Sequence, residues 1–239
     1  MKKITVLLFL ILSLHVAAQM DPGKLKMGVI SGYAFYQHDD LKAANRNVLS
    51  QIPFNARIID NFEPAVFIGG YVQYELLRYF YMGPVYEYHY TGSRIGARDY
   101  SGMYSFDQYL NAHQIGLKLD YALVTVETII FNLQLNGGAG FTDWRMESRI
   151  QFAGEEDYAE DEIEKFKGHS WYVTPGINLE YEIYPRIILT GTASYLFDIA
   201  GKYTYLYNRN MDVINQPHWG GLKLSGGIAF RLNNKEEKL

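Results

Sequence analysis

The chain of 239 residues contains no cysteine. Its absence excludes a disulfide framework, thiolate metal ligands and an anchor on a lipid-modified cysteine. Long apolar runs are also missing, because no stretch of 18 or more apolar residues follows residue 20. The mean hydropathy of −0.16 agrees with this, so the sequence does not predict a protein that crosses a membrane with helices.

Positive charge is scarce, with 22 Lys and Arg against 26 Asp and Glu. Two of the lysines, Lys2 and Lys3, precede an apolar stretch at 6–14, and small residues follow at 16–18. This order is typical of a cleaved export signal. We therefore predict a signal peptide at 1–18 and one mature domain at 19–239. Without the signal the formal charge is −6, which argues against a nucleic-acid partner.

Aromatic residues are abundant, at 15% of the chain, and Tyr is the commonest of them. Many lie at the ends of segments in which apolar and polar residues alternate. From Trp171 to Tyr181 every second residue is apolar or Pro, whereas Thr174, Asn178 and Glu180 lie between them. Such alternation predicts a β-strand whose two faces meet different environments. Eight strands are predicted, at about 25–36, 64–76, 79–90, 108–121, 128–141, 169–183, 187–197 and 220–232.

The predicted connections alternate between long and short. The first two long connections cover 37–63 and 91–107, whereas the short ones contain only a few residues. This asymmetry is typical of outer-membrane barrels, which have brief periplasmic turns and extended external loops. We therefore predict an all-β fold, an eight-stranded antiparallel up-and-down transmembrane β-barrel with long external loops and both termini in the periplasm.

Alternation alone also fits a soluble β-sandwich or a soluble ligand-binding barrel, in which the apolar face lies inside. Two features favour a membrane. The predicted strands exceed the usual five or six residues of soluble sheets, and aromatic residues of the apolar faces gather at two levels, as membrane–water interfaces require. The level near the long loops contains Tyr88, Tyr90, Tyr109, Phe141, Trp171 and Tyr195, and the level near the short turns contains Tyr74, Phe80, Tyr121, Tyr181 and Phe230.

The opposite strand faces carry charged residues that a barrel would enclose. An eight-stranded barrel is only wide enough for side chains to fill it. We therefore expect these residues to form a polar network across the lumen, because an unpaired buried charge is costly. The predicted network contains Glu75, Glu87, His89, Lys118, Asp120, Glu180, Glu182, Lys223 and Arg231.

The segment at 155–164 has the highest density of charge, with seven acidic residues among ten. It lacks the Asp/Asn and Gly spacing of a calcium-binding loop. A solvated external loop is the preferred interpretation, and a weak divalent-cation site is the alternative. The candidate ligands for that site are Glu155, Glu156, Asp157, Glu160, Asp161 and Glu162. No other metal site and no cofactor are expected.

The strand pattern and the export signal, together with the segments 91–94, 99–102 and 106–108, resemble the small outer-membrane β-barrel domain proteins of Gram-negative bacteria. The resemblance implies export to the bacterial outer membrane, contact with outer-membrane lipids and lipopolysaccharide, and a possible surface or envelope protein partner. The chain differs from the common barrel ending, a terminal Phe, because Phe230 is followed by further residues.

We expect a non-enzymatic barrel with a lumen filled by side chains, which serves envelope structure, adhesion or surface binding through its external loops. A narrow pore or a small-ligand carrier is the first alternative. A lipid-modifying outer-membrane enzyme is the second, with His169 and Ser170 near the external lipid boundary. Adjacent residues of a strand point to opposite faces, so this pair does not support catalysis.

Overall fold

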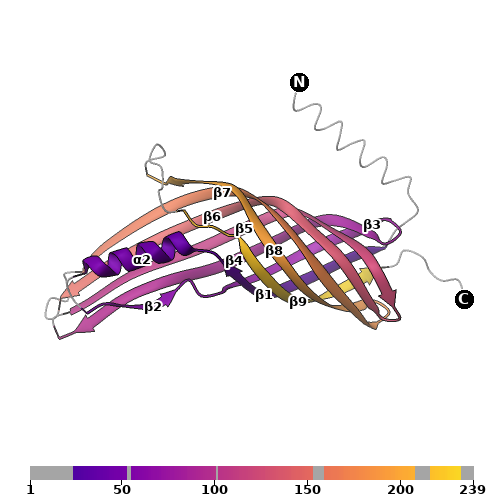
Figure 1. The fold of residues 1–239 in the computed structure, drawn as a ribbon, viewed down its shortest axis with the longest axis horizontal. Helices are drawn as coiled ribbons and strands as arrows, with labels where there is room; N and C mark the ends of the chain where they lie inside the picture. Colours follow the sequence, from indigo (N-terminus) through magenta and orange to yellow (C-terminus); the bar gives the residue numbers. More distant parts are fainter. Residues whose placement is uncertain (1–23, 53–54, 101, 153–158, 208–215, 233–239) are drawn as a thin grey trace, which may run out of the picture.

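The computed structural model describes residues 24–52, 55–100, 102–152, 159–207 and 216–232. The predicted signal peptide at 1–18 lies outside them. The elements are shown in Figure 1. In chain order they are β1 (Leu25–Tyr36), α2 (Asp39–Gln51), β2 (Arg57–Asn61), β3 (Ala65–Leu77), β4 (Phe80–Asp99), β5 (Gly102–Val126), β6 (Ile129–Phe152), β7 (Ala159–Tyr184), β8 (Ile187–Tyr205) and β9 (Gly221–Leu232).

Eight strands form a closed antiparallel ring in the order β4, β3, β1, β9, β8, β7, β6 and β5, and the pairing of β4 with β5 closes it. Turns at 78–79, 127–128 and 185–186 join β3 to β4, β5 to β6 and β7 to β8. Tyr79 and Glu127 have φ angles of 72° and 50°, in the left-handed region that tight hairpin turns often use. Both ends of the described chain lie at this short-turn end of the ring (Figure 1).

The wall of the ring is apolar outside and polar inside. Ile68 and Ile177 expose 60% and 63% of their surface, whereas Lys26, Asp120 and Glu180 expose 2% or less. A water-soluble barrel has the opposite polarity, and a membrane-spanning barrel has this one. The predicted eight-stranded transmembrane barrel is therefore confirmed. In the described ranges, no helix has the length and apolar character that a membrane crossing needs.

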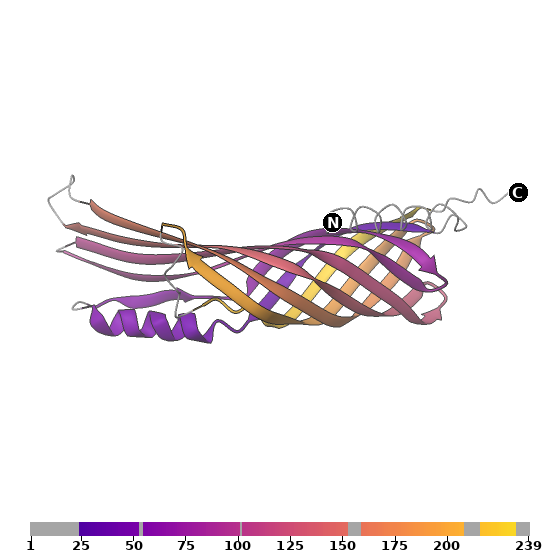
Figure 2. The same ribbon diagram turned by 90° about the horizontal axis from the view of Figure 1, so that it is seen from above.

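Strands on one side of the ring continue far beyond its long-connection end (Figure 2). β4 extends to Asp99, β5 begins at Gly102, β6 extends to Phe152, β7 begins at Ala159 and β8 extends to Tyr205. The sequence predicted that these strands end near 90, 108, 141, 169 and 197, with an irregular loop at 91–107. That interpretation of 91–107 was wrong, because the hairpin between β4 and β5 occupies the segment.

The extensions remain strands because they bury a second set of apolar side chains. Leu110, Trp144 and Phe166 are buried on the inner face of the extensions, and burial of apolar surface stabilises the sheet there. Glycine obscured this pattern in the sequence. At Gly92 a Cβ atom would lie 2.5 Å from the carbonyl oxygen of Gln108, so this strand position requires the smallest residue.

The polar segment predicted as a loop at 37–63 contains α2 and β2 instead. Asp39 and Asp40 lie in the first turn of α2, where negative charge stabilises the helix dipole. Leu41 and Asn45 are one turn apart and are both buried, so the helix presents one face to the barrel. β2 pairs with the extended part of β4. In Figure 2, α2 and β2 lie across from the long ends of β6 and β7.

These parts pack together outside the ring's mouth. We call the buried apolar residues shared by α2, the strand extensions and the β8–β9 connection the external core. It contains Leu41, Phe62, Leu110, Trp144, Phe166, Leu196 and Trp219. The rings of Trp144 and Phe166 are stacked with their centroids 4.6 Å apart, an arrangement that adds to the burial of apolar area.

A chain of hydrogen bonds attaches α2 to this core. The Asn45 amide donates to Asn61 Oδ1 over 3.0 Å, and Gln108 donates to Asn45 Oδ1 over 2.6 Å. The indole N–H of Trp144 then donates to Gln108 Oε1 over 3.1 Å. Because Asn45 is fully buried, its removal leaves two polar partners without a hydrogen bond.

We predict that Asn45→Ala weakens the attachment of α2 by about 1–3 kcal/mol, the cost of unsatisfied buried polar groups. Hydrogen–deuterium exchange of the α2 amides measures this. Asn47→Ala is the matched control, because Asn47 lies on the exposed face of the same helix and its substitution should not change exchange. Equal protection in both variants would contradict the prediction.

Candidate functional site

Six charged side chains fill the lumen towards the short-turn end, and we call them the lower ion cluster. They are Lys26, Lys118, Asp120, Glu180, Glu182 and Arg231. The ammonium nitrogen of Lys26 lies 2.6 Å from Glu180 Oε1 and 3.4 Å from Asp120 Oδ2. Lys118 Nζ lies 3.0 Å from the other oxygen of Asp120. Lys26 therefore joins carboxylates of two strands, β5 and β7, from its own position on β1.

Arg231 extends the lower ion cluster to the rim of the lumen. Its Nη1 lies 3.0 Å from Glu182 Oε2, and its Nη2 lies 3.7 Å from Glu180 Oε2. Arg231 is the register partner of Lys26 on the neighbouring strand. The cluster contains three cations and three anions, so its formal charge is zero. A cluster removed from water must be neutral, because a buried charge without a partner of opposite sign is strongly destabilising.

A second group, the upper ion cluster, consists of Glu87, His89 and Lys223 nearer the long-connection end. Lys223 forms an ion pair with Glu87, and His89 Nε2 lies 3.1 Å from Glu87 Oε2. His89 Nδ1 lies 2.8 Å from the hydroxyl oxygen of Tyr36. A neutral imidazole satisfies both contacts when Nε2–H donates to Glu87 and the Tyr36 hydroxyl donates to Nδ1. The upper ion cluster then also has zero net charge.

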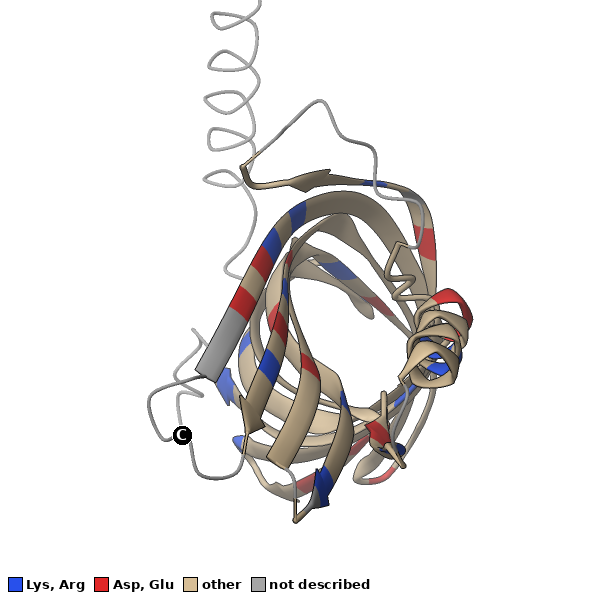
Figure 3. Ribbon diagram, turned by 90° about the vertical axis from the view of Figure 1, so that its left-hand side faces the viewer, with Lys and Arg blue, Asp and Glu red and all other residues tan. Residues whose placement is uncertain are grey.

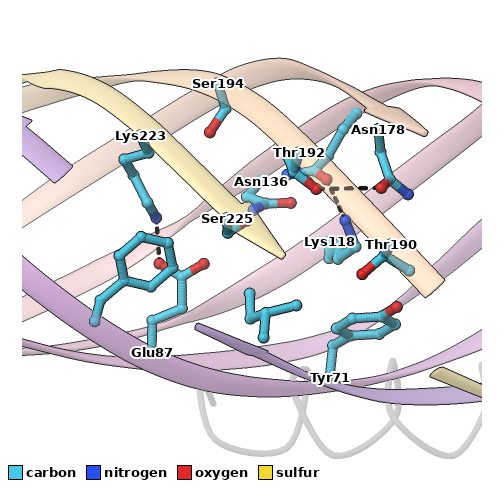
Figure 4. Close-up of a pocket in the computed structure, with 13 residues that line it drawn as sticks. Tyr71, Glu87, Lys118, Asn136, Asn178, Thr190, Thr192, Ser194, Lys223 and Ser225 are labelled. Carbon is cyan, nitrogen blue, oxygen red and sulfur yellow. Dashed lines mark hydrogen bonds and ion pairs between the residues drawn. The ribbon is translucent and has the colours of Figure 1, made fainter. Parts of the chain in front are cut away.

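Uncharged polar side chains fill the space between the two clusters. Figure 4 shows Asn136, Ser194 and Ser225 around this space, with Glu87 paired with Lys223 at one side. The cavity that they leave has a volume of about 10 Å³, close to the minimum that one water molecule needs. Side chains therefore occupy nearly all of the space between the two clusters.

Aromatic rings close the external mouth above the upper ion cluster. Trp219 is only 2% exposed, and its indole N–H donates to Thr142 Oγ1 over 2.9 Å. Its backbone N–H donates to Asp198 Oδ2 over 3.0 Å. The ring of Trp219 meets that of Tyr36 edge to face, with centroids 5.1 Å apart. These bonds hold a bulky apolar group across the opening.

His38 lies in the same layer and is 2% exposed. Among the described residues, neither of its ring nitrogens has a hydrogen-bond partner. Burial lowers the pKa of His38 to about 3, and the positive charges of Lys42 and His218 contribute to the same direction. His38 is thus held neutral between the rings of Phe62 and Trp219.

Eight of the nine predicted lumen residues lie in the two ion clusters. Glu75 differs, because it lies at the rim and accepts a hydrogen bond from the Tyr79 backbone N–H over 3.3 Å. Glu75 therefore stabilises the turn between β3 and β4. The prediction omitted Lys26, the residue that joins the two carboxylates. Its signal was present in the sequence, since Lys26 lies between Leu25 and Met27 in an alternating strand.

The residues predicted as two aromatic belts lie on the outer wall. Tyr90, Phe141, Trp171 and Tyr195 are exposed towards the external end, with Tyr88 and Tyr109 half-buried beside them. Tyr121, Tyr181 and Phe230 are exposed towards the short turns, with Tyr74 and Phe80 half-buried. The hydroxyl of Tyr88 donates to Asn111 Oδ1 over 2.7 Å, so a polar partner is available at the external level.

Neither the described residues of the acidic segment nor the candidate catalytic pair form a metal or catalytic site. Glu155, Glu156 and Asp157 lie outside the described residues, whereas Glu160, Asp161 and Glu162 belong to the strand β7. No group of three metal-ligating side chains occurs within the described ranges. His169 is exposed on the outer wall and Ser170 is buried on the inner face, so the two side chains point apart.

Comparison with solved structures finds outer-membrane proteins. The major outer membrane protein of Thermus thermophilus matches with a TM-score of 0.47 and 13% identity over 87% of this chain and 99% of its own. OprG of Pseudomonas aeruginosa has a TM-score of 0.43, 9% identity and coverages of 88% and 96%. Ail, the attachment invasion locus protein of Yersinia pestis, has a TM-score of 0.41, 10% identity and coverages of 89% and 100%. No family model and no curated protein matches the chain.

We predict that Lys26→Met destabilises the barrel by about 3–5 kcal/mol, because Asp120 and Glu180 then remain buried with one cation fewer. Urea unfolding in lipid vesicles, followed by Trp fluorescence, measures the loss. Lys24→Met is the matched control, because Lys24 is exposed on the same strand end. Adding Glu180→Gln to Lys26→Met should restore part of the stability. Equal unfolding midpoints for the Lys24 and Lys26 variants would refute the prediction.

The pKa of His38 predicts that the external mouth loses stability in mild acid. The unfolded state binds a proton near pH 6.5, whereas the folded state does so only near pH 3. Stability therefore falls as the pH decreases between these values, by about 1.4 kcal/mol for each pH unit below 6.5. From pH 7 to pH 5 the loss is about 2 kcal/mol.

The test compares the urea midpoint of the wild type with that of His38→Phe at pH 7 and pH 5. Other groups titrate in both proteins, so the informative quantity is the difference between the two midpoint shifts. His169→Gln, a change at a histidine that is exposed on the outer wall, is the control. The same pH-dependent shift in the wild type and in His38→Phe would show that His38 is not its source.

Proposed function

We propose that this protein is a non-enzymatic barrel of the bacterial outer membrane that acts through its external surface, in envelope structure, adhesion or surface binding. In this proposal, residues 1–18 are a cleaved signal peptide and the short-turn end faces the periplasm. The single observation that carries the proposal is that side chains fill the lumen. The lower ion cluster, the upper ion cluster and the ring of Trp219 lie across it.

The external part of the molecule supports a role at the cell surface. Five strands extend beyond the ring, and α2 and β2 pack against them around the external core. Figure 3, which looks onto this end, shows charged residues of both signs along the extended strands and on α2. An ordered, charged surface held above a membrane is suited to binding, because its side chains are positioned by strands instead of flexible loops.

The outer wall supports contact with outer-membrane lipids and lipopolysaccharide. The two aromatic levels fit the two interfaces of a bilayer. Beyond the external level the outward positions become charged, and Arg145 and Lys167 form exposed ion pairs with Glu147 and Asp143. Lys165 is exposed beside them, and in this proposal these cations face the phosphate groups of lipopolysaccharide. A surface or envelope protein is a further proposed partner, for which the external sheet offers the binding surface.

Conductance in planar bilayers tests the proposal against a narrow pore. We expect no steady openings above leak for the wild-type barrel, because the two ion clusters and the ring of Trp219 fill the lumen. The double variant Glu87→Ala/Lys223→Ala removes the ion pair of the upper ion cluster and tests whether the lower ion cluster and Trp219 keep the lumen closed. Steady channels in the wild type would refute the closed-lumen proposal and favour the pore.

Lipid chemistry is tested separately. We expect the acyl composition of lipid A, measured by mass spectrometry, to be the same in cells with and without the protein. The reason is that His169 and Ser170 point to opposite faces and cannot act together. A reproducible gain or loss of an acyl chain that depends on the protein would instead identify a lipid-modifying enzyme.

A further inference from the structure

A pocket on the outward face of the external sheet has a floor of small residues and a rim of arginines. Its free volume is about 620 Å³, and it lies over β2, β4, β5 and β6. Strand register places Arg57, Gly96, Ser105 and Arg149 side by side in one row across these four strands. The two small residues in the middle leave the hollow, and the two arginines form its opposite sides.

Two further arginines complete the rim. Arg94 and Arg98 flank Gly96 along the outward face of β4, because residues two positions apart on a strand share a face. Arg94 is paired with Asp107, and this is the one carboxylate among the residues that line the pocket. Arg57 and Arg98 are exposed and form no ion pair within the described part of the chain. The pocket therefore has an excess of positive charge.

The arginines indicate the chemistry of the ligand. Arg57 is the register partner of Gly96, and Arg98 lies two positions further along β4. Both line the pocket, so their guanidinium groups can contact a phosphate group of a saccharide that lies between them. Guanidinium groups form paired hydrogen bonds with phosphate oxygens, and Arg is therefore well suited to phosphate recognition. The side chain of Ile59 lies beside Gly96, so the floor offers an apolar surface against which one face of a sugar ring can pack.

The height of the pocket indicates the source of that saccharide. Gly96 follows Tyr90, a residue of the external aromatic level, by six positions. At about 3.3 Å per residue and a tilt of about 40°, the pocket lies roughly 15 Å above the lipid interface. It also faces sideways, on the outward side of the sheet. In an outer membrane, the neighbour at that height and on that side is the sugar core of lipopolysaccharide.

We propose that this pocket binds a phosphate-bearing saccharide of the lipopolysaccharide core, held by Arg57 and Arg98 over the floor of Gly96 and Ser105. The inference rests on the proposed location in the outer membrane. This inference places a ligand site on the external sheet of a barrel whose lumen is filled by side chains. Bound lipopolysaccharide would then be fixed to the external sheet by its sugars as well as to the barrel by its acyl chains.

The experiment uses the folded full-length barrel in detergent and a lipid-free, phosphorylated core oligosaccharide as the probe. Isothermal titration calorimetry measures the dissociation constant. We expect Arg57→Gln/Arg98→Gln to weaken binding at least about tenfold, since charge-assisted contacts to phosphate are lost. Arg46→Gln, which removes an exposed arginine of α2, is the matched control and should change binding less than about twofold.

Three further arms make the outcome decisive. Phosphatase-treated oligosaccharide should bind at least about tenfold more weakly, and Ser105→Glu, which adds an acid to the floor, should weaken binding similarly. Unchanged binding by the double arginine variant, or by the dephosphorylated probe, overturns the proposal. A sulfated glycan without phosphate that binds more tightly than the core oligosaccharide overturns the assignment to lipopolysaccharide. Heat-modifiable migration on gels verifies that each variant is folded.

Separate experiments test the proposed ligand site and the proposed function. Cell fractionation and bilayer conductance test the outer-membrane location and the closed lumen, and neither depends on the four arginines. A barrel that fractionates with the outer membrane and stays closed, but binds no core oligosaccharide, retains the proposed function and loses this site.

Discussion

A ring of eight strands encloses a space that only side chains can fill, so every inward charge must find an inward partner. This constraint determines the arrangement of the lumen. Lys26 contacts carboxylates from two other strands, and Arg231 continues the cluster to the rim. In the upper ion cluster, Lys223 pairs with Glu87 in the same way. The same pairing that stabilises the ring also fills its lumen with side chains.

The strands also reverse their polarity where they leave the membrane. Along β4, His89 faces inward and Tyr90 outward within the ring, whereas farther along Ile95 is buried inward and Arg94 is exposed outward. β6 shows the same change, from inward Asn136 to inward Trp144. The outer face must be apolar only where it meets lipid. Beyond that level it meets water, and the apolar residues move to the inner face.

This reversal separates two parts with different tasks. The membrane-spanning ring is a closed support whose outer wall matches the bilayer. The external sheet, with α2 and β2, is an ordinary water-exposed structure built around the external core, and its outward face is free to carry arginines. The filled ring and the exposed arginines both support the proposal that this protein acts through its external surface.

The sequence by itself determined the strands of the ring, the polarity of their faces and most of the enclosed charges, because a two-residue period is local information. It did not reveal the extensions, since reversed polarity and interspersed glycines conceal a continuing strand. Only the tertiary structure decided which charges pair. Lys26 and Glu180 are separated by 154 positions, and ring closure, which depends on the register of all eight strands, is what brings them together.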